Sequence, residues 1–177
     1  TLAGTNTYSG TTAVNGGVLA IGPGGSIAAT SNLTLAAGAA FDIANGGAQT
    51  VGGLTGAAGS QVRLGGNVLT VNRASGNQGF GGTIAGSGGL TKAGGSTLIL
   101  TAANSYSGPT TVQGGTLRAA AAGAFGSGLL TAGTGATADI DGFAQSVAGL
   151  SGAGTVMLGG ATLTVGGTAD SEFAGMI

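Results

Sequence analysis

Two pairs of carboxylates are the side chains best suited to acid–base or cation chemistry. Asp139 and Asp141 lie two residues apart, and Asp170 and Glu172 repeat that spacing. Residues two apart in a β-strand project from the same face, so each pair would place two carboxylates side by side. Such a pair could act as general acid and base, or bind calcium. The related segment 42–54 has only one of the two carboxylates and no third carboxylate lies nearby, so we interpret both pairs as solvated faces.

The remaining composition excludes several classes of site. The chain has no His and no Cys, and it has 4 Lys and Arg against 5 Asp and Glu. It therefore lacks the usual ligands of zinc, haem and iron–sulfur centres, the base of a serine triad and a thiol nucleophile. Four scattered basic residues cannot follow a phosphate backbone, which argues against nucleic acid as a partner. We predict no catalytic, cofactor-binding or metal-binding residue and expect no enzyme activity.

One nucleotide-binding pattern occurs, but its context is wrong. Gly133–Ala138 fits the loosest G-x-G-x-x-A form. That pattern has meaning only between a strand and a helix, and in a glycine-rich chain it is expected by chance. We interpret it as a turn.

The elements that would position any site are predicted to be strands. Glycine accounts for 42 of 177 residues, and the longest glycine-free stretches, Ser26–Ala37 and Ser96–Ser107, allow about three helical turns. Apolar residues instead alternate with polar ones in short runs such as Leu33–Leu35, Leu69–Val71 and Leu98–Leu100. This period of two, with Gly, Asn and Ser between the runs, indicates an all-β chain. No apolar run is long enough to suggest a membrane-spanning helix.

The chain repeats itself at a long period. Leu2–Leu19 and Leu100–Leu117 are identical at more than half of their positions, at an offset of 98. Phe80–Ile84 and Phe173–Ile177 match at an offset of 93, so single residues have been lost between the matches. Such losses are tolerated at the turns of a solenoid, whereas in a closed barrel they would disturb the strand register. The repeat predicts stacked coils of about 20 residues, roughly nine in all, forming a rod of about 40 Å.

We accordingly expect one β-helical segment over residues 1–177. It divides into a first long repeat, 2–99, and a second, truncated repeat, 100–177. Both ends fall inside partial copies, so we expect the sequence to be a piece of a longer protein. The absence of cysteine is consistent with an exported bacterial protein.

The segment Gly88–Ala119 resembles the autotransporter-associated β-strand repeat, also called the passenger-associated transport repeat. The positions that carry the resemblance are Leu90, Lys92, Gly94, Leu98, Leu100, Asn104, Tyr106, Gly108, Thr110, Val112, Gly115 and Leu117. The chain departs from the family at Ser96, where glycine is usual. The first copy, Asn6–Leu19, has only the second half of the pattern.

The resemblance implies a right-handed parallel β-helix within the passenger of a Gram-negative type V autotransporter. It also implies export through the periplasm to the cell surface, and a partner in a C-terminal outer-membrane β-barrel of the same polypeptide. Within the repeat, the resemblance and the recurrence of Tyr8 and Tyr106 favour packing roles for the two tyrosines, and a role in capping or decorating a turn for Lys92. Phe80 and Phe173 are expected to fill the core.

Three hypotheses about function remain at this stage. The first is a non-enzymatic structural stem that assists folding and secretion of the passenger and displays a functional region. The second is an adhesin or self-association module, with a host surface molecule or another copy as its partner. The third is part of a surface hydrolase, such as an esterase or protease, with its active site outside these residues.

Overall fold

The computed structural model describes residues 1–167 and 171–177, and its regular elements are all strands. An eight-stranded parallel sheet forms the first face of the molecule. Its strands, in spatial order, are β1 (Thr12–Val14), β3 (Asn32–Leu35), β6 (Gly53–Gly56), β9 (Asn77–Phe80), β12 (Thr97–Leu100), β14 (Thr116–Ala119), β16 (Thr137–Asp139) and β19 (Thr155–Met157). The prediction of an all-β chain is confirmed.

Two further faces complete each coil. A six-stranded parallel sheet consists of β5 (Gln49–Val51), β8 (Leu69–Asn72), β11 (Leu90–Ala93), β13 (Thr110–Val112), β15 (Leu129–Ala132) and β18 (Gly149–Gly152). The third face is interrupted. It begins with a four-stranded sheet of β2 (Val18–Ala20), β4 (Ala40–Asp42), β7 (Gln61–Gly65) and β10 (Thr83–Gly86), and it ends with the pair β17 (Gln145–Val147) and β20 (Leu163–Val165).

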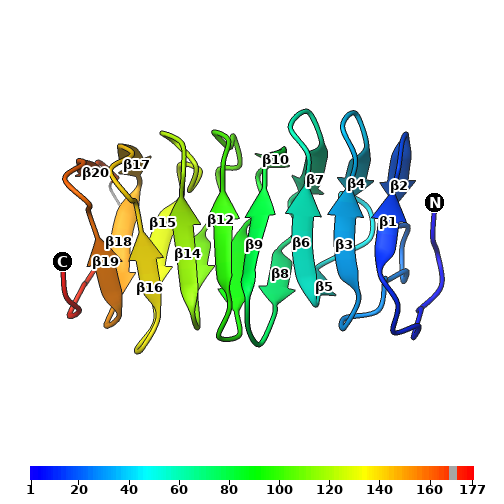
Figure 1. Ribbon diagram of the computed structural model, residues 1–177, viewed down its shortest axis with the longest axis horizontal. Helices are drawn as coiled ribbons and strands as arrows, with labels where there is room; N and C mark the ends of the chain where they lie inside the picture. Colours follow the sequence, from blue (N-terminus) through cyan, green and yellow to red (C-terminus); the bar gives the residue numbers. More distant parts are fainter. Residues whose placement is uncertain (168–170) are drawn as a thin grey trace.

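The three faces form a parallel β-solenoid. In Figure 1 the chain rises along the eight-stranded sheet that faces the viewer, crosses to the back at the top and advances from right to left. This path is right-handed, the hand that crossovers between parallel strands almost always take. The longest sheet counts eight coils rather than the predicted nine, so seven strand spacings give a length of about 34 Å.

Coil length varies, because turns between stacked strands can lengthen or shorten without disturbing the register. Ala138 pairs with Val156 one coil later, whereas Gly56 pairs with the more distant Phe80, so the second of these coils is longer than the first. This variation agrees with the drift of the sequence offset, and it is what a solenoid with contacts only between neighbouring coils permits.

The long sequence repeat does not correspond to a whole number of coils. Four steps along the eight-stranded sheet lead from β1 to β12. Thr110 is the counterpart of Thr12, but it lies beyond β12. Leu98 of β12 pairs with Leu117 in the next coil, and Thr110 lies more than half of the way along the chain between these two residues. Equivalent segments therefore occupy different faces, with Thr12 in the eight-stranded sheet and Thr110 in the six-stranded sheet. The division of the chain at residues 99 and 100 stays a prediction.

The core is a set of ladders formed by inward-facing apolar residues. On the eight-stranded sheet Leu33 pairs with Leu54, and Leu98 pairs with Leu117; all four are fully buried. Outward positions are polar, as alternation requires. On the six-stranded sheet the outward residues form one aligned column in consecutive strands: Thr50, Thr70, Thr91, Thr111, Thr131 and Ser151.

The ladder gives a first prediction about stability. We expect Leu117→Ala to lower the free energy of unfolding by about 2–5 kcal/mol, because it leaves a cavity between two coils. The neighbouring outward substitution Thr116→Ala should change it by less than about 1 kcal/mol. Urea unfolding monitored by far-UV circular dichroism measures both, and equal effects would contradict the inward and outward assignment.

Candidate functional site

The repeat motif lies where the third face loses its strands. Between β10 and β17 this face is crossed by segments 104–108 and 123–127, which are not strands. The Asn104 side chain replaces the missing rungs: its Oδ1 accepts a hydrogen bond from the Ile84 N–H at 2.7 Å, and its Nδ2 donates to the Ala124 carbonyl at 2.6 Å. One amide thus connects the preceding coil to the following one, and backbone groups that would otherwise be unpaired are satisfied.

A glutamine continues the same bridge to the next coil. Gln145 is buried; its Oε1 accepts from the Phe125 N–H at 3.1 Å, and its Nε2 donates to the carbonyls of Ala121 and Phe143. Gln78 plays a similar part on the eight-stranded sheet, where its Oε1 accepts from the Leu54 N–H at 3.3 Å. At these places, where strand pairing weakens, side-chain amides therefore supplement the backbone hydrogen bonds.

Tyr106 is the core plug of the motif. It is fully buried, and its hydroxyl lies 2.6 Å from Thr110 Oγ1, which in turn donates to the Phe125 carbonyl at 2.7 Å. The single proton of Thr110 is used by Phe125, so Tyr106 must be the donor in the first bond. Burial raises the pKa of Tyr106, which keeps the phenol protonated for this role. Gly126 lies beside the Tyr106 ring and has a positive φ of 66°. Only glycine fits there, because a Cβ would lie 2.7 Å from a ring atom of Tyr106.

The first copy of the motif keeps some of these bonds in a more exposed setting. Asn6 Nδ2 donates to the Ser26 carbonyl at 2.8 Å, as Asn104 does to Ala124. The Tyr8 hydroxyl lies 2.5 Å from Thr12 Oγ1, but the Tyr8 side chain is 39% exposed. The motif is therefore a repeated local structure, and the predicted packing role of the tyrosine is complete only in the second copy.

Lys92 lies in the interior. It pairs in register with Val71 and Val112 and is fully buried. Its Nζ donates to three carbonyls, Ala93 at 2.7 Å, Gly94 at 2.9 Å and Gly114 at 3.2 Å, the last on the following coil. Lys92 thus caps a turn, as predicted, and desolvation lowers its pKa to about 8.

The carboxylate pair Asp139 and Asp141 lies beside an arginine. Arg118 precedes Asp139 by one coil and pairs with it in register; its Nε lies 2.9 Å from Asp141 Oδ2 and 3.7 Å from Asp139 Oδ2. The interpretation as a solvated face did not include this cation, because coil length varies and the spacing alone does not fix which residues meet. Asp170, from the second pair, lies outside the described residues.

The other sequence candidates have structural positions. Gly133–Ala138 spans the turn between β15 and the start of β16, with no helix after it. Phe80 is fully buried, and Phe173 is half-buried against the core. Within residues 1–167 and 171–177 no group of three His, Cys, Asp or Glu residues could hold a metal ion. The same described part of the chain contains no helix of the length and apolarity that a membrane crossing needs.

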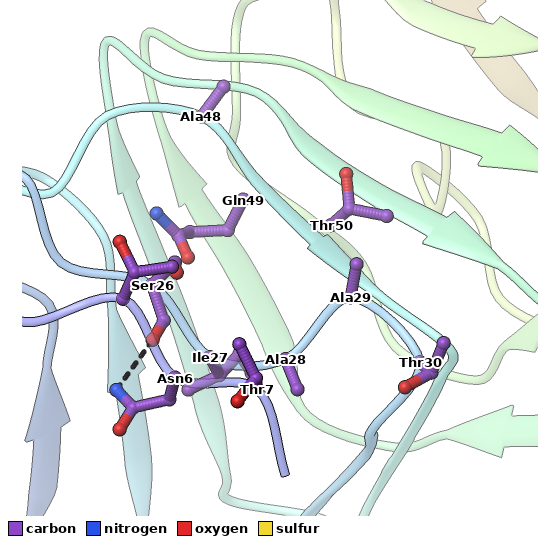
Figure 2. A pocket seen from close by; sticks show the side chains of 11 residues that line it. Asn6, Thr7, Ser26, Ile27, Ala28, Ala29, Thr30, Ala48, Gln49 and Thr50 are labelled. Atoms are coloured by element: carbon purple, nitrogen blue, oxygen red, sulfur yellow. Dashed lines mark hydrogen bonds between the residues drawn. The ribbon is translucent and has the colours of Figure 1, made fainter. Parts of the chain in front are cut away.

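A shallow groove of about 420 Å³ lies near the N-terminal end of the solenoid (Figure 2). It crosses three consecutive coils, which contribute residues 5–7, 26–30 and 48–50. Small apolar side chains, among them Ala28 and Ala29, and hydroxyl and amide groups line it. No sequence pattern indicates this groove, because it depends on how the loop of residues 26–30 lies between the neighbouring coils.

Comparison with known proteins identifies the repeat. The model of the passenger-associated transport repeat matches residues 1–21 and 90–119, the two segments that contain Asn6, Tyr8, Lys92, Asn104 and Tyr106. These segments belong to the passenger-associated transport repeat family. The match covers these two segments, less than half of the chain, and the repeat that they match is one associated with the transport of passengers.

The chain is also similar to a curated relative. It is 47% identical over 87 residues to an adhesin BmaC autotransporter of Brucella suis biovar 1 (strain 1330). That match covers 45% of this chain and 2% of the relative, so the chain represents only a small part of such a protein. No solved structure matches the chain.

The bridging amides give the second prediction. We expect Asn104→Ala to lower the free energy of unfolding by about 2–4 kcal/mol, because the Ile84 N–H and the Ala124 carbonyl lose their partner. Asn6→Ala removes bonds to two carbonyls only and should cost about 1 kcal/mol. Urea unfolding measures both variants, and hydrogen exchange should show faster exchange of the Ile84 amide in the first; an unchanged rate would argue against the bridge.

Lys92 gives the third prediction, a dependence of stability on pH. From about pH 8 the folded state releases the Lys92 proton while the unfolded state, with the ordinary pKa of 10.5, retains it. The unfolded state then binds more protons, so the free energy of unfolding rises as the pH is raised. Urea unfolding from pH 7 to about 9.5 should show this rise, and Lys92→Met should remove it. The same slope in both proteins would contradict the assignment.

Proposed function

We propose that this chain is a non-enzymatic β-helical stem of an autotransporter passenger, which assists passenger folding and translocation across the outer membrane of a Gram-negative bacterium. The observation that carries the proposal is the bridge made by Asn104, whose side chain joins the coil before it to the coil after it. Each motif copy therefore locks neighbouring coils together as soon as they stack. A rod that folds coil by coil outside the cell resists sliding back through its exit.

Its principal partner on this proposal is a C-terminal outer-membrane β-barrel of the same polypeptide, reached through the periplasm. The stem would hold a functional region away from the cell. The side-chain bridges and turn caps described above support a structural role, because their polar groups are used to satisfy one another and the backbone.

Adhesion is the second candidate function. The observation that favours it is the similarity to a relative named as an adhesin. Partners would then be a host surface molecule or another copy of the chain. Binding of chain-coated beads to host cells or to one another would favour this candidate, and a lack of binding would leave the stem. Turnover of an esterase or protease substrate by the chain alone would overturn the non-enzymatic assignment.

The stem proposal gives the fourth prediction. The chain, placed before an outer-membrane β-barrel in a Gram-negative host, should appear at the cell surface, where added protease can cleave it. We expect the double variant Asn104→Ala, Tyr106→Ala to reduce the surface-exposed amount several-fold at equal synthesis, because both bonds of Asn104 to neighbouring coils and the buried Tyr106 ring are lost. The outward variant Thr111→Ala is the matched control. Equal display of all three proteins would contradict a role of the motif in translocation.

A further inference from the structure

The chain carries the tripeptide Asn-Gly-Gly twice, each time in a turn. Asn15–Gly17 joins β1 to β2, and Asn45–Gly47 lies between β4 and β5. Both asparagines are exposed, and the last glycine of each turn has a similar positive φ, 70° at Gly17 and 76° at Gly47. Asparagine before glycine is prone to deamidation, because glycine has no Cβ to hinder attack by its own backbone nitrogen. The two turns are equal in sequence, so their contacts must distinguish them.

The second of these turns is held in place. The Gly46 N–H donates to the Ile43 carbonyl at 3.0 Å, and the Gly46 carbonyl accepts from Gln49 Nε2 at 3.2 Å. Gly46 also lies against the preceding coil, where a Cβ would overlap the Ile21 side chain. The backbone nitrogen that would attack Asn45 is therefore engaged in a hydrogen bond, and its residue is fixed by packing.

The first turn has neither restraint. Gly16 is exposed, and a Cβ added to it would meet nothing within 4 Å. In the described part of the chain, no hydrogen bond is made by the Gly16 N–H or by the Asn15 side chain, and the side-chain bonds of this region end at Thr12. The nitrogen of Gly16 and the side-chain amide of Asn15 are therefore free to approach each other.

The second repeat shows that a preceding coil does not engage this nitrogen. Gln113 and Gly114 are the counterparts of Asn15 and Gly16, and a complete coil precedes them. The Gly114 carbonyl accepts from Lys92, but among the described residues the Gly114 N–H has no hydrogen-bond partner either. Gln113 should nevertheless react far more slowly, because its longer side chain would have to close a six-membered ring.

We propose that Asn15 is a site of spontaneous deamidation in the folded chain, whereas Asn45 is protected. The Gly16 nitrogen loses its proton and attacks Asn15 Cγ. A new N–C bond forms, the side-chain amide leaves as ammonia, and a five-membered succinimide results. Water then adds to either carbonyl of this ring and opens it to aspartate or isoaspartate. One water is consumed and one ammonia is released overall, without a change in oxidation state.

The modification changes the surface and leaves the solenoid intact. It adds one negative charge to a chain whose formal net charge is −1. The isoaspartyl product also lengthens the backbone of the turn by one atom, which turns between coils tolerate because each coil contacts only its neighbours. The Gly17 carbonyl still accepts from the Ala40 N–H at 2.8 Å and keeps the turn attached to the next coil. The site is independent of the stem function, and it gives the rod a surface charge that increases with age.

The test incubates the whole folded chain at mildly alkaline pH and follows both asparagines by tandem mass spectrometry. Asn15 and Asn45 lie in the same tryptic peptide, residues 1–63, so every molecule carries both the site and its control. Labelling by a protein isoaspartyl methyltransferase measures the isoaspartyl product separately. We expect Asn15 to react about ten-fold faster than Asn45, because the Gly46 hydrogen bond must open before Asn45 can be attacked. The far-UV circular dichroism spectrum should stay unchanged.

Two variants and the unfolded chain are the controls. Asn15→Gln and Gly16→Ala should each suppress the reaction at residue 15 and leave Asn45 as it is; the open space at Gly16 lets alanine fit without disturbing the fold. In urea the two tripeptides are equivalent and should react at similar rates. Equal rates in the folded chain, or faster reaction at Asn45, would overturn the proposal. A preference for Asn15 that is as large in urea would also overturn it, because the sequence alone would then be the cause.

Discussion

Hydrogen bonding between successive coils is the constraint on which this structure depends. A short strand in a solenoid cannot pair with the strand beside it in sequence, so its N–H and C=O groups must find partners one coil away. The parallel sheets meet this requirement along the first two faces. On the third face regular strands are missing between β10 and β17, and there the side-chain amides of Asn104 and Gln145 add bonds to the backbone bonds that remain. The solenoid continues because a buried backbone group is rarely left unpaired.

This constraint gives the repeat motif a physical meaning. Asparagine combines one acceptor and a two-proton donor on a short side chain, so it can join two coils that flank its own. Tyr106 fills the core behind it and, through Thr110, fixes the loop that carries the Phe125 carbonyl. Lys92 uses its three donors on three turn carbonyls. Asn104 and Lys92 thus satisfy backbone groups of their own or a neighbouring coil, and Tyr106 acts on the backbone through Thr110, so the polar groups of the motif are used within the structure.

The two copies also show how a small change in a loop alters a surface. The long repeat does not correspond to a whole number of coils, so equivalent segments of the two copies lie on different faces of the rod. A feature of one copy therefore does not recur along the same face. One additional residue after Ser26 leaves Gln49 without the partner that Gln145 has. The two copies therefore differ locally in hydrogen bonding while the core ladders remain intact.

The sequence by itself determined the fold class and the motif. Alternation in runs such as Leu33–Leu35 specified strands, the long-period recurrence specified a solenoid, and the missing His and Cys removed most catalytic chemistry. Only the tertiary structure decided which face each copy occupies, that Arg118 binds both Asp139 and Asp141, and that Gln49 lacks a donor. The physical reason is that local periodicity records which residues face inward. Contacts between coils instead depend on the summed lengths of the intervening turns, which differ from one coil to the next.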